Sequence, residues 1–433
     1  MTASPAEVGV VGWKCAVCGA AVDIAEALVF RCPNATAADP HHSLRIIQHD
    51  ARLARVSDDP NPFIAYRPYF AWDSFAAARG MAETDREDMV RATDAKIAAV
   101  AGTGFAVTPL ERASALSDAL GFTTDGGVWI KDETHNVAGS HKARHLFSTL
   151  LHLLTVEALG DAPWPALAGR PSLAIASCGN AALAAATLAA AVEWPLQVFV
   201  PANADPIVVN ALGALGASVT TCPRRRSDPP GDPCVLRCRE AVAHGSIPFT
   251  VQGPESAWCL DGGRTIGWEM ADLHADHLFV QVGGGALARC AIGGLAGAPG
   301  RLPKLHAVQT EGCAPLARAW HRALAGEGGV AHASAHWSEY MTPWETPPQS
   351  AADGILDDET YDWLGVVSGM AASHGAPIIA KESEILSANA LAHEHTTIDA
   401  SHTGTAGLAG LLAIRDVVSS HERVAVIFSG VRR

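Results

Sequence analysis

The chain has 433 residues, more than one hydrophobic core usually serves, so two or three domains are expected. Hydrophobic residues make up 48% of the sequence and charged residues 18%, a balance that excludes an intrinsically disordered protein. The formal net charge of −14 argues against nucleic acid or an anionic membrane surface as the main partner, because both favour basic proteins.

Three features favour a soluble cytoplasmic protein. Residues 1–7, MTASPAE, have neither the basic nor the apolar run of an export signal. The ten cysteines lack dense regular spacing, which is typical of reduced thiols in the cytoplasm. The most apolar window, residues 173–192, is about long enough to span a bilayer. Its first half contains Ser177, Gly179 and Asn180, which favour a strand, turn and helix over a membrane span.

The N-terminal 50 residues carry a candidate metal site. Cys15 and Cys18 form a Cys-x-x-Cys pair, and Cys32 follows after a gap of 13 residues. With His41 or His42 as the fourth ligand, these cysteines would make a small zinc site. A second Cys-x-x-Cys pair is absent, so free cysteines are the alternative interpretation.

The rest of the chain shows an alternation of strand and helix patterns. Residues 51–100 combine a proline-rich connection with a helix over residues 81–100. Beyond residue 104, strands are predicted over residues 128–130, 173–176, 196–200, 277–282, 305–308 and 424–428, and helices over residues 142–159, 181–191 and 205–213. This alternation indicates βαβ units and parallel sheets with both faces covered. Ligands bind at the carboxyl ends of strands in such sheets, so the turns after these strands are candidate sites.

The first such turn, residues 131–144 (KDETHNVAGSHKAR), places Lys142 at the start of a helix. The positive end of the helix dipole disfavours a second positive charge there. Together with burial, that field would lower the pKa of the lysine and make it a better amine nucleophile. Taken alone, a solvated lysine is the ordinary interpretation.

Two further turns offer anion-binding backbone. In residues 177–181 (SCGNA), backbone N–H groups would suit a carboxylate and the Asn180 amide a phenolate-like oxygen, although an asparagine helix cap is the plain alternative. In residues 283–287 (GGGAL), three glycines let the backbone approach a phosphate, although a tight turn explains them equally well.

Together and in this order, the three turns resemble the fold-type-II pyridoxal-phosphate enzymes, the tryptophan synthase β superfamily, over residues 104–433. The pattern Lys-x-Glu-x-x-Asn-x-x-x-Ser-x-Lys-x-Arg ending at Arg144 is similar to the cofactor-lysine segment of that family. Ser-x-Gly-Asn-x-Ala resembles its asparagine loop and residues 283–287 its phosphate cradle. Ser429 resembles the serine that faces the pyridine nitrogen in the dehydratases, and residues 263–269 and 311–316 resemble segments of threonine synthases.

The resemblance implies a fold and a set of site residues. The fold would be α/β, with two unequal parallel-sheet domains: a large pyridoxal-phosphate domain of residues 51–165 and 263–433, and a small domain of residues 166–262, after an N-terminal cysteine-containing segment of residues 1–50. Lys142 would hold the cofactor as a Schiff base and remove the Cα proton of the substrate. Further cofactor-binding residues would be His141, Asn180, Gly283, Gly284, Gly285, Ala286, Leu287 and Ser429, and substrate-binding residues Ser140, Ser177, Cys178 and Gly179.

The implied activity is elimination of water from a 3-hydroxy-2-amino acid such as serine, threonine or a phenylserine, giving a 2-oxo acid and ammonia. A hydroxyl at Ser429, instead of a carboxylate, would leave the pyridine nitrogen largely unprotonated and favour elimination over transamination. His141 is a departure: dehydratases usually have an aromatic residue there and tryptophan synthase β a histidine, which would add a proton relay or simply pack under the ring. The Glu-x-Gly-Ala-Gly-Gln-type loop of tryptophan synthase β is missing, which argues against indole chemistry.

Two other functions remain as alternatives. A threonine synthase acting on O-phosphohomoserine would need a site for a second phosphate, and Arg144 and Arg264 are the candidates, without a further basic cluster. A catalytically silent, cofactor-binding regulatory protein is the alternative from a different class. The aromatic segment of residues 337–344 would line a substrate pocket or belong to the core, and residues 401–407 fit a helix N-terminus near the cofactor. Beyond a small amino-acid substrate no partner is indicated, and assembly into a homo-oligomer is compatible with the sequence.

Overall fold

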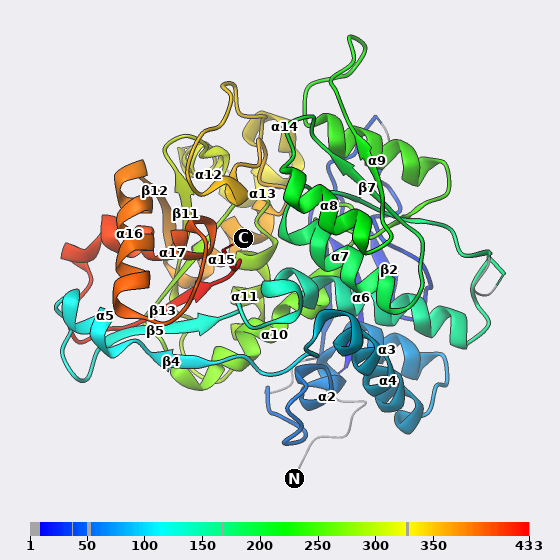
Figure 1. Cartoon of the computed structure of the whole chain (residues 1–433), viewed down its shortest axis with the longest axis horizontal. Coiled ribbons are helices and arrows are strands. Elements are labelled where there is room, and N and C mark those ends of the chain that lie inside the picture. Colours follow the sequence, from blue (N-terminus) through cyan, green and yellow to red (C-terminus); the bar gives the residue numbers. More distant parts are fainter. Residues whose placement is uncertain (1–8, 37, 50–52, 166–168, 326–328, 433) are drawn as a thin grey trace. The chain divides into compact units, whose positions relative to one another are not determined.

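The computed structural model describes residues 9–36, 38–49, 53–165, 169–325 and 329–432 (Figure 1). Residues 1–7, on which the expected lack of an export signal rests, lie outside the described residues. By contacts the chain divides into two units: Met1–Val107 with Asn136–Ala138 and Lys142–Gly263, and Thr108–His135 with Gly139–His141 and Arg264–Arg433.

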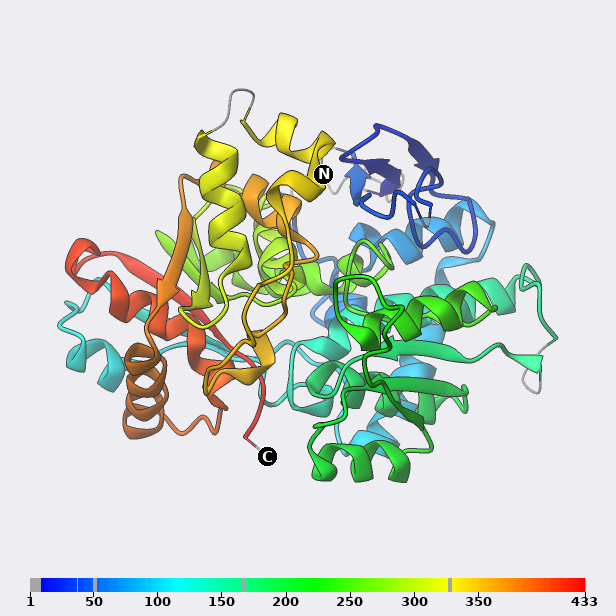
Figure 2. The ribbon, with the colours of Figure 1, turned by 90° about the horizontal axis from the view of Figure 1, so that it is seen from above.

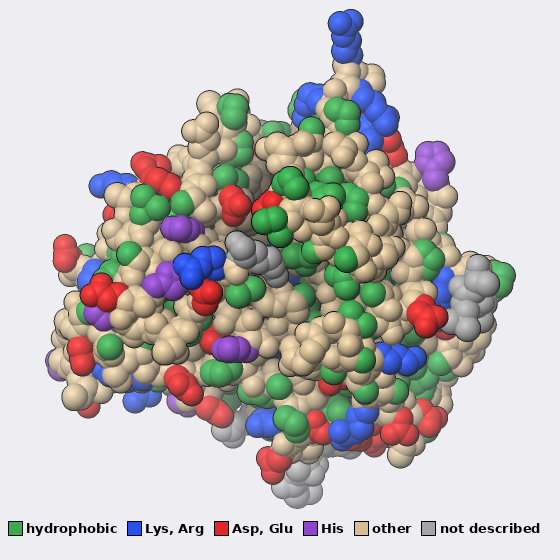
Figure 3. Space-filling model, in the orientation of Figure 1, with side chains coloured by type: hydrophobic (Ala, Val, Ile, Leu, Met, Phe, Trp, Pro, Cys, Tyr) green, Lys and Arg blue, Asp and Glu red, His purple; other side chains and the backbone are tan. Residues whose placement is uncertain are grey.

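The first unit contains a four-stranded parallel sheet in the order β8-β7-β6-β9. Its strands are β6 (Leu173–Ala176), β7 (Leu196–Val200), β8 (Ser218–Thr221) and β9 (Ile247–Pro248), accompanied by the helices α7 (Asn180–Ala191), α8 (Pro206–Ala214) and α9 (Pro233–Ala243). Proline at the first position and an aspartate cap begin two of these helices: Asp205 accepts from the N–H of Ile207, and Asp232 from that of Cys234. The loop before α9 carries a group of basic side chains (Figure 3).

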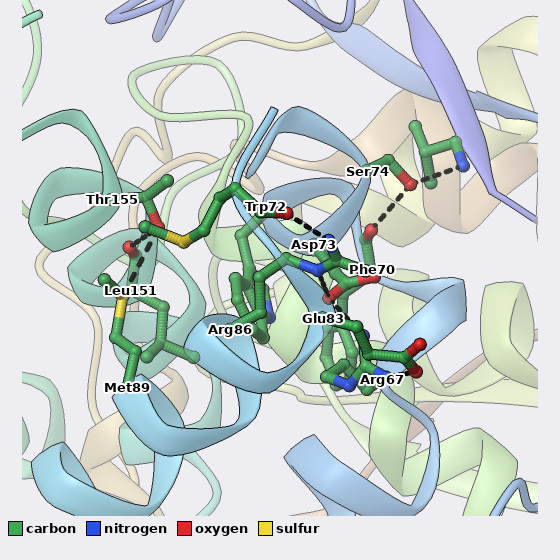
Figure 4. Close-up of polar contacts among 12 residues, drawn as sticks. Arg67, Phe70, Trp72, Asp73, Ser74, Glu83, Arg86, Met89, Leu151 and Thr155 are labelled. Carbon is green, nitrogen blue, oxygen red and sulfur yellow. Dashed lines mark hydrogen bonds and ion pairs between the residues drawn. The ribbon is translucent and has the colours of Figure 1, made fainter. Parts of the chain in front are cut away.

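The first unit also contains a group of helices: α6 (Lys142–Ala158), α2 (Pro62–Ala65), α3 (Ala71–Ala78) and α4 (Glu83–Ala101). The buried Asp73 carboxylate accepts from the Arg67 guanidinium at 2.8 Å and from that of Arg86 at 2.7 Å, which joins α3 to α4 (Figure 4). The Thr155 hydroxyl of α6 donates to the sulfur of Met89 in α4 at 3.4 Å. These contacts hold α6 in a packed helical layer.

An N-terminal module precedes these helices (Figure 2). Strands β1 (Val10–Cys15), β2 (Ala21–Asp23) and β3 (Leu44–Gln48) form an antiparallel sheet in the order β2-β1-β3. The Ser74 hydroxyl of α3 accepts the N–H of Val10 at 2.9 Å, so the module rests on α3.

The second unit contains a six-stranded sheet in the order β12-β11-β10-β13-β5-β4, parallel except for β4 against β5. Its strands are β4 (Leu110–Arg112), β5 (Gly127–Asp132), β10 (His277–Gln281), β11 (Lys304–Thr310), β12 (Ala376–Ala380) and β13 (Arg423–Phe428). Its helices are α5 (Ser114–Ala119), α11 (Ala286–Leu295), α12 (Pro315–Ala325), α13 (Gly329–Ala335), α14 (Trp337–Tyr340), α15 (Trp363–Ser373), α16 (Glu382–His395) and α17 (His402–Ala413), while α10 (Cys259–Met270) begins in the first unit and ends in the second. A Cβ on Gly410 of α17 would lie 2.3 Å from Val308, so glycine lets this helix pack closely on the sheet.

The expected α/β fold with parallel sheets is confirmed. The four-stranded sheet falls within the predicted small domain and the six-stranded sheet within the predicted large one. By contacts, however, α6 and the helices before residue 107 group with the first unit, so the predicted boundaries differ from this division and stay a prediction. No helix in the described ranges has the length and apolarity needed to cross a membrane.

Candidate active site

Three neighbouring strands of the second unit end at candidate site residues. In the order β10-β13-β5, the carboxyl ends lead into Gly283–Gly285, into Ser429 and into the loop of residues 133–141. The parallel register pairs Phe428 with Asp132, and the N–H of Glu133 donates to the Phe428 carbonyl at 2.8 Å. The fold therefore places Ser429 beside the loop that leads to Lys142.

Ser429 is bonded to the residue before Lys142. Its buried hydroxyl accepts the backbone N–H of His141 at 3.1 Å and lies 2.5 Å from the His141 ring Nδ1. The start of α17 lies beside Ser429 as well, since the Ser429 N–H donates to the Gly404 carbonyl at 3.2 Å. The His141 ring therefore contacts the Ser429 hydroxyl, which is the group that the family resemblance would place opposite the pyridine nitrogen.

A tight turn delivers Lys142 to the first position of α6. Ala138 has φ 56° and Gly139 φ 70°, two successive left-handed residues, of which only the glycine adopts that conformation without steric cost. Ser140 is fully buried and Lys142 half-buried. The first turn of α6 contains no acidic side chain.

Lys131, the other lysine of this segment, has a structural role. Its ammonium donates to Glu269 Oε2 at 2.5 Å and to the Thr108 carbonyl at 2.6 Å, with both charged side chains fully buried. The Thr108 hydroxyl donates to Glu133 Oε1 at 2.6 Å. This network, whose members Thr108 and Glu269 were not predicted from the sequence, fixes the end of β5 and leaves Lys131 committed to an ion pair.

The histidines of α6 are held neutral. Burial, and next the nearby charge of Lys142, lower the pKa of His145 to about 3, although its ring bonds to the Cys259 carbonyl at 2.8 Å. Burial alone lowers the pKa of His152 to about 3. A neutral His145 adds no positive charge of its own within one turn of Lys142.

The glycine turn is closed on its Cβ side by protein. A Cβ on Gly283 would lie 2.3 Å from the carboxylate of Asp357, and a Cβ on Gly284 would lie 3.2 Å from the Tyr361 ring. Gly285 has φ 94° and caps α11 without a side-chain hydrogen bond. Among the described residues, no hydrogen bond uses the backbone N–H groups of residues 284–287. Free donors at a helix N-terminus suit an anionic group such as phosphate.

In the first unit, the asparagine loop joins β6 to α7. Asn180 is the first residue of α7 and is half-buried, and Cys178 is exposed. The Ser177 hydroxyl accepts the N–H of Gly179 at 3.3 Å, and Gly179 caps the helix without a side-chain bond. The cap position of α7 is thus Gly179 and not Asn180. The turn offers backbone N–H groups at a second helix start.

Two aromatic residues of the segment 337–344 belong to the core. Trp337 and Tyr340 are buried, and both rings pack on Trp363 with centroids 5.4 and 6.4 Å away. Of the two arginines considered for a second phosphate, Arg144 lies in the first unit and Arg264 in the second, where its guanidinium stands 4.9 Å over the Trp268 ring.

Separate from these turns, the N-terminal module brings four candidate metal ligands together. Atoms of Cys15, Cys18, Cys32 and His42 lie within 4.8 Å of one another, so the structure selects His42 over His41 as the fourth ligand. Burial alone would raise the pKa of Cys15, but hydrogen bonds with the N–H groups of Cys18 and Val17 and with the side chains of His42 and Cys18 together lower it to about 6. The cluster is therefore equipped to hold a metal ion.

Comparison with known proteins identifies the family. Residues 102–430 match the sequence profile of the pyridoxal-phosphate dependent enzymes. The chain belongs to this family. No curated protein matches the sequence.

Solved structures agree on the fold. The processed form of threonine deaminase isoform 2 from Solanum lycopersicum is 18% identical with a TM-score of 0.59, covering 81% of this chain and 91% of that one. Maize serine racemase is 18% identical with a TM-score of 0.59, covering 80% and 93%. A fungal L-serine ammonia-lyase from Rhizomucor miehei is 17% identical with a TM-score of 0.57, covering 75% and 94%. At these identities the likeness establishes the fold-type-II architecture and leaves the reaction to the site itself.

Proposed function

We propose that this family member is a lyase that removes water from a 3-hydroxy-2-amino acid and yields a 2-oxo acid and ammonia. The observation that carries the proposal is the buried hydroxyl of Ser429 at the end of β13, where it neighbours the segment ending at Lys142. A neutral hydroxyl opposite the pyridine nitrogen does not hold a proton there as a carboxylate would. The ring is then a weaker electron sink, which favours prompt loss of a β-leaving group over transamination.

The residues present fit pyridoxal phosphate. Lys142 would hold it covalently, the N–H groups of residues 284–287 would bind its phosphate, and Asn180 would donate to its phenolic oxygen. When bound, the cofactor withdraws electrons and stabilises negative charge at the substrate Cα. Ser177–Gly179 offer backbone N–H groups for the substrate carboxylate, and Ser140 is proposed as a further substrate contact.

The chain would supply the proton transfers. The Lys142 amine would take the Cα proton of the substrate. As the Cβ–O bond breaks, Lys142 would pass that proton to the departing hydroxyl, which leaves as water. The enamine product hydrolyses in solution to the 2-oxo acid and ammonia, so no external oxidant or reductant is required.

A substrate screen tests this function. We expect serine, threonine or a phenylserine to yield a 2-oxo acid and equimolar ammonia with the purified holoenzyme. Threonine and phosphate from O-phosphohomoserine would instead establish a threonine synthase, and loss of optical activity without 2-oxo acid would establish a racemase. Either result overturns the proposal, and so does an unresponsive cofactor absorbance with every amino acid.

For the four-ligand cluster of the N-terminal module, we propose zinc as the ion. Thiolates and imidazole are the ligands that zinc prefers, and a closed set of four protein ligands is typical of structural sites. Metal analysis should find about one zinc per chain.

A further inference from the structure

The cluster of Cys15, Cys18, Cys32 and His42 has the geometry of a closed zinc site. The Sγ atoms of Cys18 and Cys32 lie 3.5 Å apart, and Cys15 Sγ lies 3.4 Å from His42 Nδ1. A tetrahedron with metal–sulfur bonds of about 2.3 Å separates two sulfurs by about 3.8 Å, so only small shifts are needed to admit the ion.

The surroundings of these ligands are those of a metal site. The N–H groups of Val17 and Cys18 point at Cys15 Sγ, at 3.4 and 3.5 Å. The ring nitrogen of His42 that faces away from Cys15 lies 3.3 Å from a carboxylate oxygen of Asp39. A carboxylate at that position orients a ligating histidine.

The segment that runs into Cys32 is bonded to α6 and to the stretch before α10. The N–H of Leu28 donates to His152 Nε2 of α6 at 3.3 Å. The Val29 carbonyl accepts the Trp258 indole N–H at 2.9 Å, and the Phe30 carbonyl accepts the Ala257 N–H at 2.8 Å. Residues 28–30 are therefore all bonded to other parts of the first unit. They end two positions before Cys32, the proposed metal ligand.

Aromatic rings also join the N-terminal module to α6. Trp13 of β1 packs edge-on against Trp258 with centroids 5.2 Å apart, and Trp258 stacks on His152 at 3.6 Å. Leu28 has φ 57°, a strained conformation for leucine that persists only when its surroundings enforce it. The bond from Leu28 to His152 and the bonds of Val29 and Phe30 are the contacts that hold this conformation.

The stretch of residues 257–262 then transmits this contact toward the beginning of α6. The Ser148 hydroxyl donates to the Trp258 carbonyl at 2.8 Å and accepts the Gly262 N–H at 2.9 Å. His145 bonds to the Cys259 carbonyl at 2.8 Å, one turn beyond Lys142. The N-terminal module, residues 257–262 and the first half of α6 therefore form one packed layer.

We propose that the zinc-loaded N-terminal module is a clamp, in which the ion holds residues 28–30 against α6 and residues 257–258 and thereby sets how firmly the helix that begins at Lys142 is held. This clamp rests on the proposed zinc and on no step of the proposed reaction. Its natural readout is amide hydrogen exchange of α6, which needs no turnover.

The test compares two buried cysteines. Cys32 is a proposed ligand, Cys222 directly follows β8 of the four-stranded sheet, and each is 4% exposed. We expect Cys32→Ala to lose zinc and to exchange about tenfold or more faster over residues 142–158 and 255–262. Cys222→Ala should keep zinc and wild-type exchange in those segments, and α16 of the second unit should exchange unchanged in both variants.

A second variant separates the clamp from the metal. Trp13→Leu leaves all four ligands in place, so it should retain zinc while α6 exchanges faster. If Cys32→Ala does not fold, chelation of zinc from the intact holoenzyme replaces it, with the same expected exchange. Metal-free wild-type protein overturns the zinc site. Zinc loss, or Trp13→Leu, with unchanged exchange in α6 overturns the clamp while the zinc site stands.

Discussion

At the scale of single residues, the arrangement around Lys142 explains why this lysine and not Lys131 is the candidate for covalent attachment. Lys131 is fully buried and ion-paired with Glu269 at 2.5 Å, so its amine is committed. Lys142 is half-buried and begins α6, whose first turn contains no acidic residue. The two lysines lie eleven positions apart in one segment, and only the fold separates their roles.

Replacement of Lys142 by alanine should abolish turnover but not cofactor binding. The glycine turn and Asn180 contribute binding that does not depend on the covalent link. The same amine would serve attachment and proton removal, and general-base catalysis alone is worth about 10²–10⁴-fold, so the rate should fall by at least that much. Borohydride reduction of wild-type protein followed by peptide mapping should place the pyridoxyl group on Lys142; any other lysine would refute the assignment.

A charged residue at position 429 would test whether Ser429 faces the pyridine nitrogen. In Ser429→Asp, a carboxylate near the ring nitrogen would favour its protonated form and stabilise the substrate carbanion. Elimination should slow and transamination by-products should increase, as measured by the ratio of 2-oxo acid to aminated cofactor. Ser429→Ala, which removes the bond to His141 without adding charge, is the control and should keep the wild-type ratio. An unchanged ratio in Ser429→Asp would mean that another residue faces the nitrogen.

At the scale of elements, two buried histidines of α6 make the free energy of unfolding depend on pH. His145 and His152 have pKa values lowered to about 3, mainly by burial. Above their ordinary pKa of about 6.5 both are neutral in the folded and unfolded chains. As the pH falls below that value, the unfolded chain takes up protons that the folded chain refuses, so stability is lost toward acid.

We expect each of these histidines to lower the free energy of unfolding by about 1.4 kcal/mol per pH unit between pH 6 and pH 4. Denaturant titrations of wild type and His152→Gln should show a shallower acid loss in the variant. His135, whose side chain is 77% exposed, supplies the control, since His135→Gln should leave the slope unchanged. Equal slopes in wild type and His152→Gln would contradict a neutral buried histidine.

The strands and helices show which elements sequence alone can predict. The six predicted strands are all present, two with the predicted ends, because each is a short apolar run buried in a parallel sheet. Some of the strands that were not predicted lack that signal: β8 is mostly exposed, and β9 has two residues, one of them proline. β1 alternates buried and exposed positions around a glycine.

For the candidate site, sequence patterns located the turns but not their partners. Strand–turn–helix patterns predicted the positions of Lys142, Asn180 and the glycines, since these lie at strand ends whatever the tertiary packing. The bonds from Ser429 to His141 and from Glu269 to Lys131 join residues 288 and 138 positions apart. Such pairings depend on strand order, which no local pattern records. The choice of His42 over His41 likewise needed the fold of the N-terminal module.

At the scale of the whole molecule, net charge bears on the substrate class. With a formal charge of −14, the protein repels an anionic substrate such as O-phosphohomoserine during diffusional encounter, whereas a zwitterionic hydroxy amino acid carries no net charge. The arginines that would offset this repulsion are buried or engaged: Arg144 is fully buried, Arg264 stands over Trp268, and Arg289 is paired with Asp362 at 2.7 Å.

The two substrate classes should therefore differ in their dependence on salt. For a zwitterion we expect kcat/KM to be nearly constant as ionic strength rises, because screening has no net interaction to weaken. For a phosphorylated substrate or inhibitor, added salt should strengthen binding, since screening over about 10 Å removes the repulsion at 0.1 M. Rates with threonine and inhibition by O-phosphohomoserine, measured across a salt series, check both expectations. Binding of the phosphate ester that weakens with salt would reveal a local basic site strong enough to override the net charge, and would favour threonine synthase chemistry.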